Sequence, residues 1–159
     1  PWLQNAPVRH IVVTWGNHDW APFNNLVSVC YAIVLIEESA VINKVKIYGS
    51  PWSLPFREWA WMAPETTLEK IYRDIPEDVD VIVSHTPPYG ICDQVSDGNF
   101  CGSRALLNRI KSLSNLKLLV CGHIHEARGR DGVVANVSSV YNREGHIIPR
   151  VDPWTIVDI

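Results

Sequence analysis

The 159-residue sequence contains no apolar run close to the roughly 18 residues that a membrane-spanning helix needs. Its longest apolar stretch, VSVCYAIVLI at 27–36, is too short. The first residues, PWLQNAP, contain no basic segment followed by an apolar one, so we expect no secretory signal. We therefore expect a cytoplasmic protein with no membrane partner.

Strong net charge and paired cysteines are also missing. The formal charge is −3 and the pI is about 6.1, which argues against nucleic acid as a partner. The four cysteines (Cys30, Cys92, Cys101 and Cys121) form no C-x-x-C pair, which argues against a thiol-rich zinc site. Free thiols in a reducing compartment are favoured over disulfides, although Cys92 and Cys101 are close enough in sequence to pair.

What the sequence does contain is a single-domain pattern of apolar strands alternating with helices. Uninterrupted β-branched runs predict buried strands, whereas apolar residues at helical spacing between Pro64 and Pro76, and again after a capping Ser103, predict helices. Segment 27–36 fits either a helix or a strand. The expected strands are 9–15, one or two within 40–50 around a turn at 43–44, 79–84, 116–121, 133–137 and 154–159. This alternation predicts an α/β layered fold.

Histidines follow three of the apolar runs. The stretches are TWGNHDW at 14–20, SHTPP at 84–88 and CGHIHE at 121–126. In open α/β sheets, the loops after the carboxyl ends of the strands build the site. The spacing of His123 and His125 after Gly122 lets two imidazoles project in different directions. Together with His85 and the amide of Asn17, such side chains suit Zn, Mn, Fe or Ni.

These motifs carry a family resemblance. GNHD, the histidine of SHTPP, and GHIH resemble, in the same order, the later blocks of the calcineurin-like metallophosphoesterases, over roughly residues 8–158. YGSPWSLPFREWAW, SHTPPYGICD, CGHIHEARG and NVSSVY are similar to the brain-type metallophosphoesterase-domain proteins and their microbial and phage relatives. The resemblance implies a layered α-β-β-α sandwich and a phosphodiesterase of broad substrate range, active on small phosphate esters.

The resemblance also implies roles for individual residues around two divalent ions (Mn, Fe, Zn or Ni). Asn17, His85 and His123 match ligands of the second metal, and His125 matches a ligand of the first. His18 matches the histidine that contacts the substrate phosphate and protonates the leaving group, with Asp19 orienting it. In such a centre two metals clamp the phosphate, a bridging hydroxide attacks, and a general acid helps to expel the alkoxide. We therefore expect His18 and Asp19 to be catalytic and Asn17 and His18 to bind substrate.

The sequence departs from the family pattern before Gly16. The Asp-x-His and Gly-Asp blocks, which supply carboxylate ligands including the one that bridges both metals, are absent. The first metal keeps one recognisable ligand and the second keeps three, none of them anionic. Three neutral ligands can hold zinc, whereas a hard ion such as Mn or Mg would bind poorly.

We accordingly interpret residues 1–159 as the carboxyl-terminal portion of a calcineurin-like phosphoesterase domain that lacks its first strands. A truncated chain is favoured over a natural short relative, because two missing central strands would leave edges and apolar faces uncovered. The leading hypothesis is a metal-dependent phosphodiesterase that hydrolyses cyclic nucleotides or similar diesters. The alternatives are a degenerate, inactive metal-binding module, and an oligomer or partner chain that completes the sheet.

Several other residues leave their roles open. Arg128, just after GHIHE, is our candidate to bind the substrate phosphate, although a surface role is the simpler interpretation. Asp93 fits either the site or a solvated turn equally well. The cluster of Trp52, Trp59 and Trp61 fits an aromatic platform for a nucleobase, but core packing or a lid is favoured.

Overall fold

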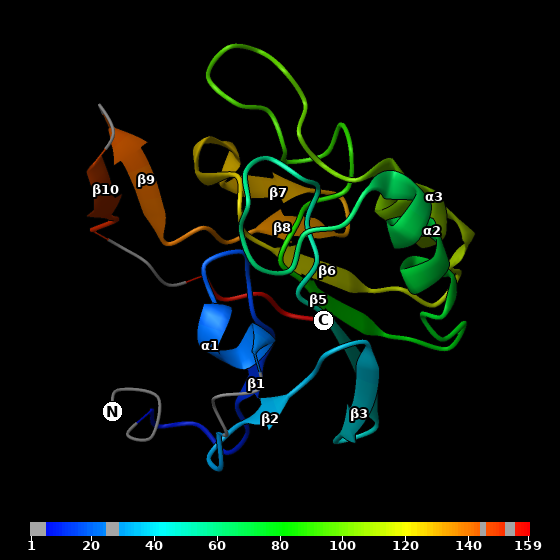
Figure 1. Ribbon diagram of the computed structural model, residues 1–159. Coiled ribbons are helices and arrows are strands. Elements are labelled where there is room, and N and C mark those ends of the chain that lie inside the picture. Colours follow the sequence, from blue (N-terminus) through cyan, green and yellow to red (C-terminus); the bar gives the residue numbers. More distant parts are fainter. Residues whose placement is uncertain (1–5, 25–28, 144–145, 152–154) are drawn as a thin grey trace.

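The computed structural model describes residues 6–24, 29–143, 146–151 and 155–159, and a mixed six-stranded β-sheet forms its centre (Figure 1). Its strands are β3 (Glu38–Ile42), β4 (Val45–Ser50), β5 (Val81–Ser84), β6 (Leu118–Cys121), β7 (Gly129–Asp131) and β8 (Val134–Asn136). They lie in the order β3-β4-β5-β6-β8-β7. The four inner strands are parallel, and the edge strands β3 and β7 are antiparallel to their neighbours. The carboxyl ends of β5, β6 and β8 therefore meet at one edge of the sheet.

Two small sheets accompany this large one. Strands β1 (Val12–Val13) and β2 (Ile33–Val34) pair in parallel, and β9 (Val140–Arg143) pairs antiparallel with β10 (His146–Pro149). The chain that leaves β2 presses on the large sheet, because a Cβ placed on Gly49 would lie only 2.3 Å from the Cβ of Leu35. A glycine in β4 thus permits this close approach.

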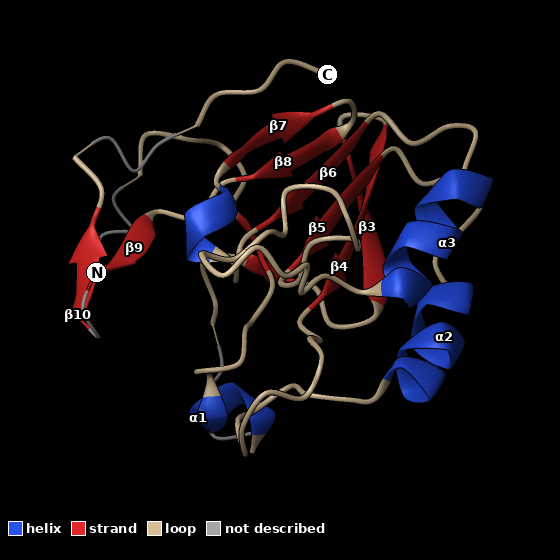
Figure 2. Ribbon diagram, turned by 90° about the horizontal axis from the view of Figure 1, so that it is seen from above, coloured by secondary structure: helices blue, strands red, loops and turns tan. Residues whose placement is uncertain are grey.

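Helices α2 (Glu65–Arg73) and α3 (Arg104–Ser112) lie side by side against one face of the large sheet (Figure 2). As predicted, Ser103 caps α3: its Oγ accepts a hydrogen bond from the amide of Leu106 at 3.1 Å. The other helices are short, namely α1 (Trp20–Phe23) and the 3-10 helix η2 (His125–Ala127). Across the described ranges, no helix has the length and apolar character needed to cross a bilayer.

Alternating side chains of the inner strands divide the core into two clusters. Ile82, Leu119 and Val134 are buried between the sheet and the helices. Their sequence neighbours point to the opposite face, where Val81, Leu118 and Ala135 are buried but the surrounding aliphatic side chains are only half-buried. These half-buried residues are Val45, Ile47, Val83, Val120, Val137 and Val157. Parallel sheets are normally covered on both faces, so this second face is the less protected side of the described fold.

The predicted α/β architecture is confirmed, and the differences follow from strand pairing. The runs at 79–84 and 116–121 become β5 and β6, and 40–50 forms the β3–β4 hairpin around Asn43 and Lys44, both with positive φ. The predicted strand at 9–15 is reduced to β1, because only Val12 and Val13 find partners in β2. Segment 27–36 contributes β2, although its first two residues lie outside the described ranges. Within the predicted strand at 154–159, residues 155–159 form no regular element, and Trp154 lies outside those ranges.

We expect Glu65→Gln to lower the free energy of unfolding by about 1–2 kcal/mol. The Glu65 carboxylate joins the two helices, because it accepts from the amides of Arg104 at 2.6 Å and Ala105 at 3.1 Å and from Ser103 Oγ at 3.1 Å. A glutamine lacks the negative charge, and its side-chain NH₂ group, which cannot accept a hydrogen bond, would face these N–H and O–H donors. Urea unfolding should show the loss, and Glu69→Gln, an exposed carboxylate on the same helix, is the control. Equal midpoints for the two variants would contradict this role.

Candidate metal centre

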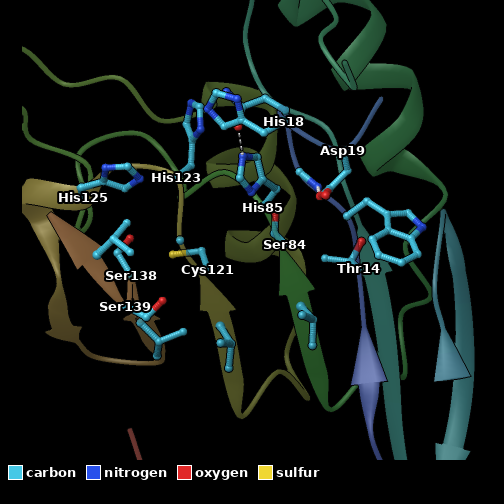
Figure 3. Close-up of a pocket in the computed structure, with 18 residues that line it drawn as sticks. Thr14, His18, Asp19, Ser84, His85, Cys121, His123, His125, Ser138 and Ser139 are labelled. Atoms are coloured by element: carbon cyan, nitrogen blue, oxygen red, sulfur yellow. Dashed lines mark hydrogen bonds between the residues drawn. The ribbon is translucent and has the colours of Figure 1, made fainter. Parts of the chain in front are cut away.

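A cavity of about 430 Å³ opens where the carboxyl ends of β5, β6 and β8 meet the loop that follows β1. All three predicted histidine clusters contribute to its lining. Figure 3 shows His18, His85 and His123 gathered at one end, with His125 beyond His123. Strand-end residues far apart in the sequence thus share one cavity, as expected for an α/β sheet.

The GNHD loop is held in a tight turn by its own aspartate. The Gly16 amide donates to Asp19 Oδ2 at 2.7 Å, and the Asp19 amide donates back to the Gly16 carbonyl at 2.9 Å. This carboxylate therefore fixes the loop backbone. The turn buries Asn17, which is 3% exposed, and leaves His18 exposed at the rim.

The loop approaches the end of β5 very closely. A Cβ placed on residue 16 would lie 2.5 Å from Cε1 and 2.6 Å from Nδ1 of the His85 ring. Only glycine leaves room for the imidazole at this distance. The contact brings Asn17 Oδ1 within 2.8 Å of His85 Nε2. Because Oδ1 can only accept a hydrogen bond, Nε2 carries the hydrogen in this pair.

The third donor comes from the chain after β6. The rings of His85 and His123 have centroids 4.7 Å apart, and the Gly122 amide donates to the His85 carbonyl at 3.1 Å. At this point the backbone is left-handed at His123, with φ of 64°, and not at the neighbouring glycine, Gly122. A histidine in this region is uncommon and strained, and such conformations cluster at functional sites.

Burial keeps these imidazoles uncharged. Burial, and to a smaller extent repulsion from the other cavity histidines, lowers the pKa of His85 to about 3 and that of His123 to about 4. Burial also lowers the pKa of His125. At neutral pH the three rings are therefore neutral, which is the form that binds a metal ion.

The backbone around His125 is supported by residues that the sequence analysis did not single out. Arg150 donates to the carbonyls of His125 at 2.8 Å and Ser138 at 3.1 Å. Asn136 Nδ2 donates to the Ile124 carbonyl at 2.9 Å, and Asn136 Oδ1 accepts from Ser138 Oγ at 2.8 Å. Asn136 ends β8 and Ser138 follows the apolar run 133–137, much as the histidine clusters follow theirs, so their position was a usable signal in the sequence. No pattern in the sequence pointed to Arg150, because tertiary folding brings it to this position.

Two residues with open roles lie elsewhere. Arg128 lines a separate hollow of about 380 Å³ and donates to the Ser138 carbonyl at 3.2 Å and to Thr155 Oγ1 at 3.0 Å. Asp93 lines the same hollow, is 1% exposed, and accepts from the Gly102 amide at 2.7 Å. The structure therefore does not bring either residue into the histidine-lined cavity.

The donor set fits one metal ion better than two. Within the described residues, no group of three His, Cys, Asp or Glu side chains is placed to hold a metal. The candidate site depends instead on two imidazoles and an amide, those of His85, His123 and Asn17. The donor atoms of Asn17 and His85 already face one another, and the His123 ring lies beside that of His85. An ion would replace the hydrogen on His85 Nε2. His125 is the single predicted donor for a second ion, and the carboxylate of Asp19 is engaged with Gly16.

We expect Gly16→Ala to weaken zinc binding about 10- to 100-fold, although it removes no donor atom. The added methyl group would collide with the His85 ring and displace it from Asn17. Isothermal titration calorimetry with zinc measures the loss, and circular dichroism checks that the variant folds.

Gly122→Ala provides the matched control, because a Cβ there would meet only Ser138 Oγ, at 3.8 Å. Its zinc affinity should stay near that of the wild type. If both alanine variants bound zinc equally well, the close approach of Gly16 would have no role in forming the site.

Comparison with known proteins agrees with this geometry. Residues 2–127 match the family model described as calcineurin-like phosphoesterase. The human metallophosphoesterase domain-containing protein 1 is 29% identical over 170 residues, covering 88% of this chain and 51% of that protein. A UPF0046 protein of Caenorhabditis elegans is 31% identical over 151 residues, covering 80% of this chain and 53% of the relative. The chain spans about half the length of these curated relatives, and the resemblance carried by GNHD, SHTPP and GHIH is confirmed: it belongs to the calcineurin-like phosphoesterase family.

Proposed function

We propose that the protein is a metal-dependent phosphodiesterase that hydrolyses cyclic nucleotides or similar diesters. The observation that supports this function most strongly is the convergence of Asn17, His85 and His123, from three separate strand ends, on one cavity. The family generally uses two divalent ions. We propose that Asn17, His85 and His123 hold one of them, and that His125 is a ligand of the other, which this chain does not retain through His125 alone.

The donor types favour zinc for the better-defined site. Neutral nitrogen and amide donors suit zinc and other borderline ions, whereas manganese prefers oxygen-rich, anionic surroundings. A bound ion would supply Lewis-acid chemistry, polarising the phosphoryl oxygen and activating a water molecule. The cavity is lined by Ser138 and Ser139 on its other side, which leaves polar surroundings for a phosphate.

His18 is the proposed proton donor to the leaving group. It lines the cavity but is exposed, unlike the buried donors beside it. Its ring lies against Trp59, with centroids 4.7 Å apart, so the imidazole is positioned from outside the cavity. Asp19 supports this role indirectly, since its carboxylate shapes the loop that carries His18. A positioned general acid commonly contributes a factor of about 10²–10⁴ to the rate.

The same proposal includes the context of the chain. We propose that residues 1–159 form the carboxyl-terminal portion of a phosphoesterase domain, and that an oligomer or partner chain covers the half-buried aliphatic face of the sheet. The substrate is a small phosphate ester. The four cysteines are free, which supports a cytoplasmic location because reducing compartments keep thiols unpaired.

A second candidate function is a metal-binding module without catalytic activity. The lack of a three-residue His, Cys, Asp or Glu group within the described ranges favours it. This candidate and the enzyme differ in one observable, because only the enzyme shows turnover that a chelator removes. Hydrolysis lost on adding EDTA and restored by zinc would exclude the inactive module.

We expect His18→Ala to lower kcat for 3′,5′-cyclic AMP, whose alkoxide leaving group needs a proton, about 10²- to 10⁴-fold while zinc binding stays unchanged. The proton donor is lost, but the buried donors remain in place. His10→Ala, which removes another exposed histidine, should leave both properties intact. Unaltered turnover in His18→Ala would show that this residue has no part in the mechanism. Loss of zinc binding together with turnover would show that His18 is a metal ligand rather than a proton donor.

A further inference from the structure

Two aromatic side chains and one arginine form a partly exposed cluster next to His18. Phe56 is 70% exposed, and its ring centroid lies 5.7 Å from that of the half-buried Trp59. The guanidinium carbon of Arg57 lies 5.6 Å from each ring centroid. We call Phe56, Arg57 and Trp59 the aromatic rim. Single exposed aromatics are ordinary, but two rings and a cation gathered beside a cavity are a recognisable binding surface.

The aromatic rim is fixed to the site by its backbone. The loop that carries it is closed by the amide of Ser53, which donates to the Trp61 carbonyl at 2.9 Å. The Ala60 amide then donates to the Asn17 carbonyl at 3.1 Å, and Trp61 Nε1 donates to the Asp19 carbonyl at 3.2 Å. Two hydrogen bonds therefore join this loop to the GNHD turn, so the rim and His18 keep a defined relative position.

The other tryptophans of this stretch have a different role. Trp61 is 8% exposed and meets Trp52 and Phe23 edge to face, with centroids 5.6 and 5.1 Å apart. This packing holds the base of the loop and confirms core packing for Trp61. Trp59 differs, because it is half-buried between the rings of His18 and Phe56.

We propose that the aromatic rim binds a planar aromatic group carried by the phosphate ester whose phosphate lies at His18. The bound ring would stack on the exposed side chain of Phe56, and the guanidinium of Arg57 would add cation–π attraction to the face of that ring. A nucleobase and a simple aryl group share this chemistry. The inference deepens the proposed function, on which the position of the phosphate rests, and makes Phe56, Arg57 and Trp59 specificity-determining residues.

The test measures binding without turnover, in the presence of zinc. One pair of probes is phenylphosphonate and methylphosphonate, whose C–P bonds are not hydrolysed by a phosphoesterase. A second pair is adenosine 5′-monophosphate and ribose 5-phosphate, which resemble products of a diesterase. Calorimetry should show that the aromatic member of a pair binds about 5- to 10-fold more tightly.

Variants of the aromatic rim test whether it is the origin of the preference for aromatic probes. Phe56→Ala and Trp59→Ala should abolish it, and Arg57→Gln should reduce it. Phe100→Ala, which removes an exposed phenylalanine from the hollow lined by Arg128, should retain it. Preference in the adenosine pair alone supports a nucleobase as the occupant, whereas preference in both pairs supports any aromatic ring.

Three results would overturn the proposal: equal affinities within both pairs, no binding of any probe, or a preference that survives both alanine substitutions. A failure of the proposed enzymatic function can be distinguished from a failure of the aromatic subsite. A chain that prefers aromatic probes but shows no chelator-sensitive turnover lacks the enzymatic function and keeps the aromatic subsite. A chain that hydrolyses diesters but binds aromatic and non-aromatic probes equally well has the enzymatic function and lacks the aromatic subsite.

Discussion

The close contact between the backbone at Gly16 and the imidazole of His85 determines the arrangement of the whole candidate site. Any side chain at position 16 would occupy the space of the ring. With glycine there, Asn17 Oδ1 reaches His85 Nε2, and the Asp19 carboxylate closes the turn from within. The loop that carries the aromatic rim is in turn bonded to the carbonyls of Asn17 and Asp19. The close contact between Gly16 and His85 thus determines how Asn17, His18 and the aromatic rim lie relative to the His85 imidazole.

The chemistry of the cavity follows from its few carboxylates: among the described residues that line it, Asp19 alone carries one, and that group accepts a hydrogen bond from Gly16. Burial holds the pKa values of His85 and His123 far below neutrality, so both rings stay uncharged without a neighbouring anion. The metal site that we propose would attract an ion through nitrogen donors rather than through net charge, which favours zinc over magnesium or manganese. The carboxylates expected from the family's Asp-x-His and Gly-Asp blocks would change that preference, and the 159 residues contain neither block.

Sequence patterns predicted those features that depend on local chemistry. The β-branched runs of β5 and β6 and the Ser103 cap needed no knowledge of distant residues. The clusters GNHD, SHTPP and GHIH predicted the cavity because parallel strands present their carboxyl ends together. Distances between loops were not predictable: neither Arg150 under His125 nor Trp59 beside His18 follows from spacing along the chain. The left-handed conformation of His123 was not predictable either, since glycine is the usual residue in that region.

The most direct test of this account is the number of metal ions that the 159-residue chain retains. The purified chain would be dialysed against zinc and manganese separately, and bound metal counted by elemental analysis. The neutral donors of Asn17, His85 and His123 predict one zinc ion per chain and no retained manganese. Two ions per chain, or manganese held as firmly as zinc, would contradict the account. Either result requires anionic ligands, and among the described residues the cavity presents only the Asp19 carboxylate, which holds the Gly16 turn.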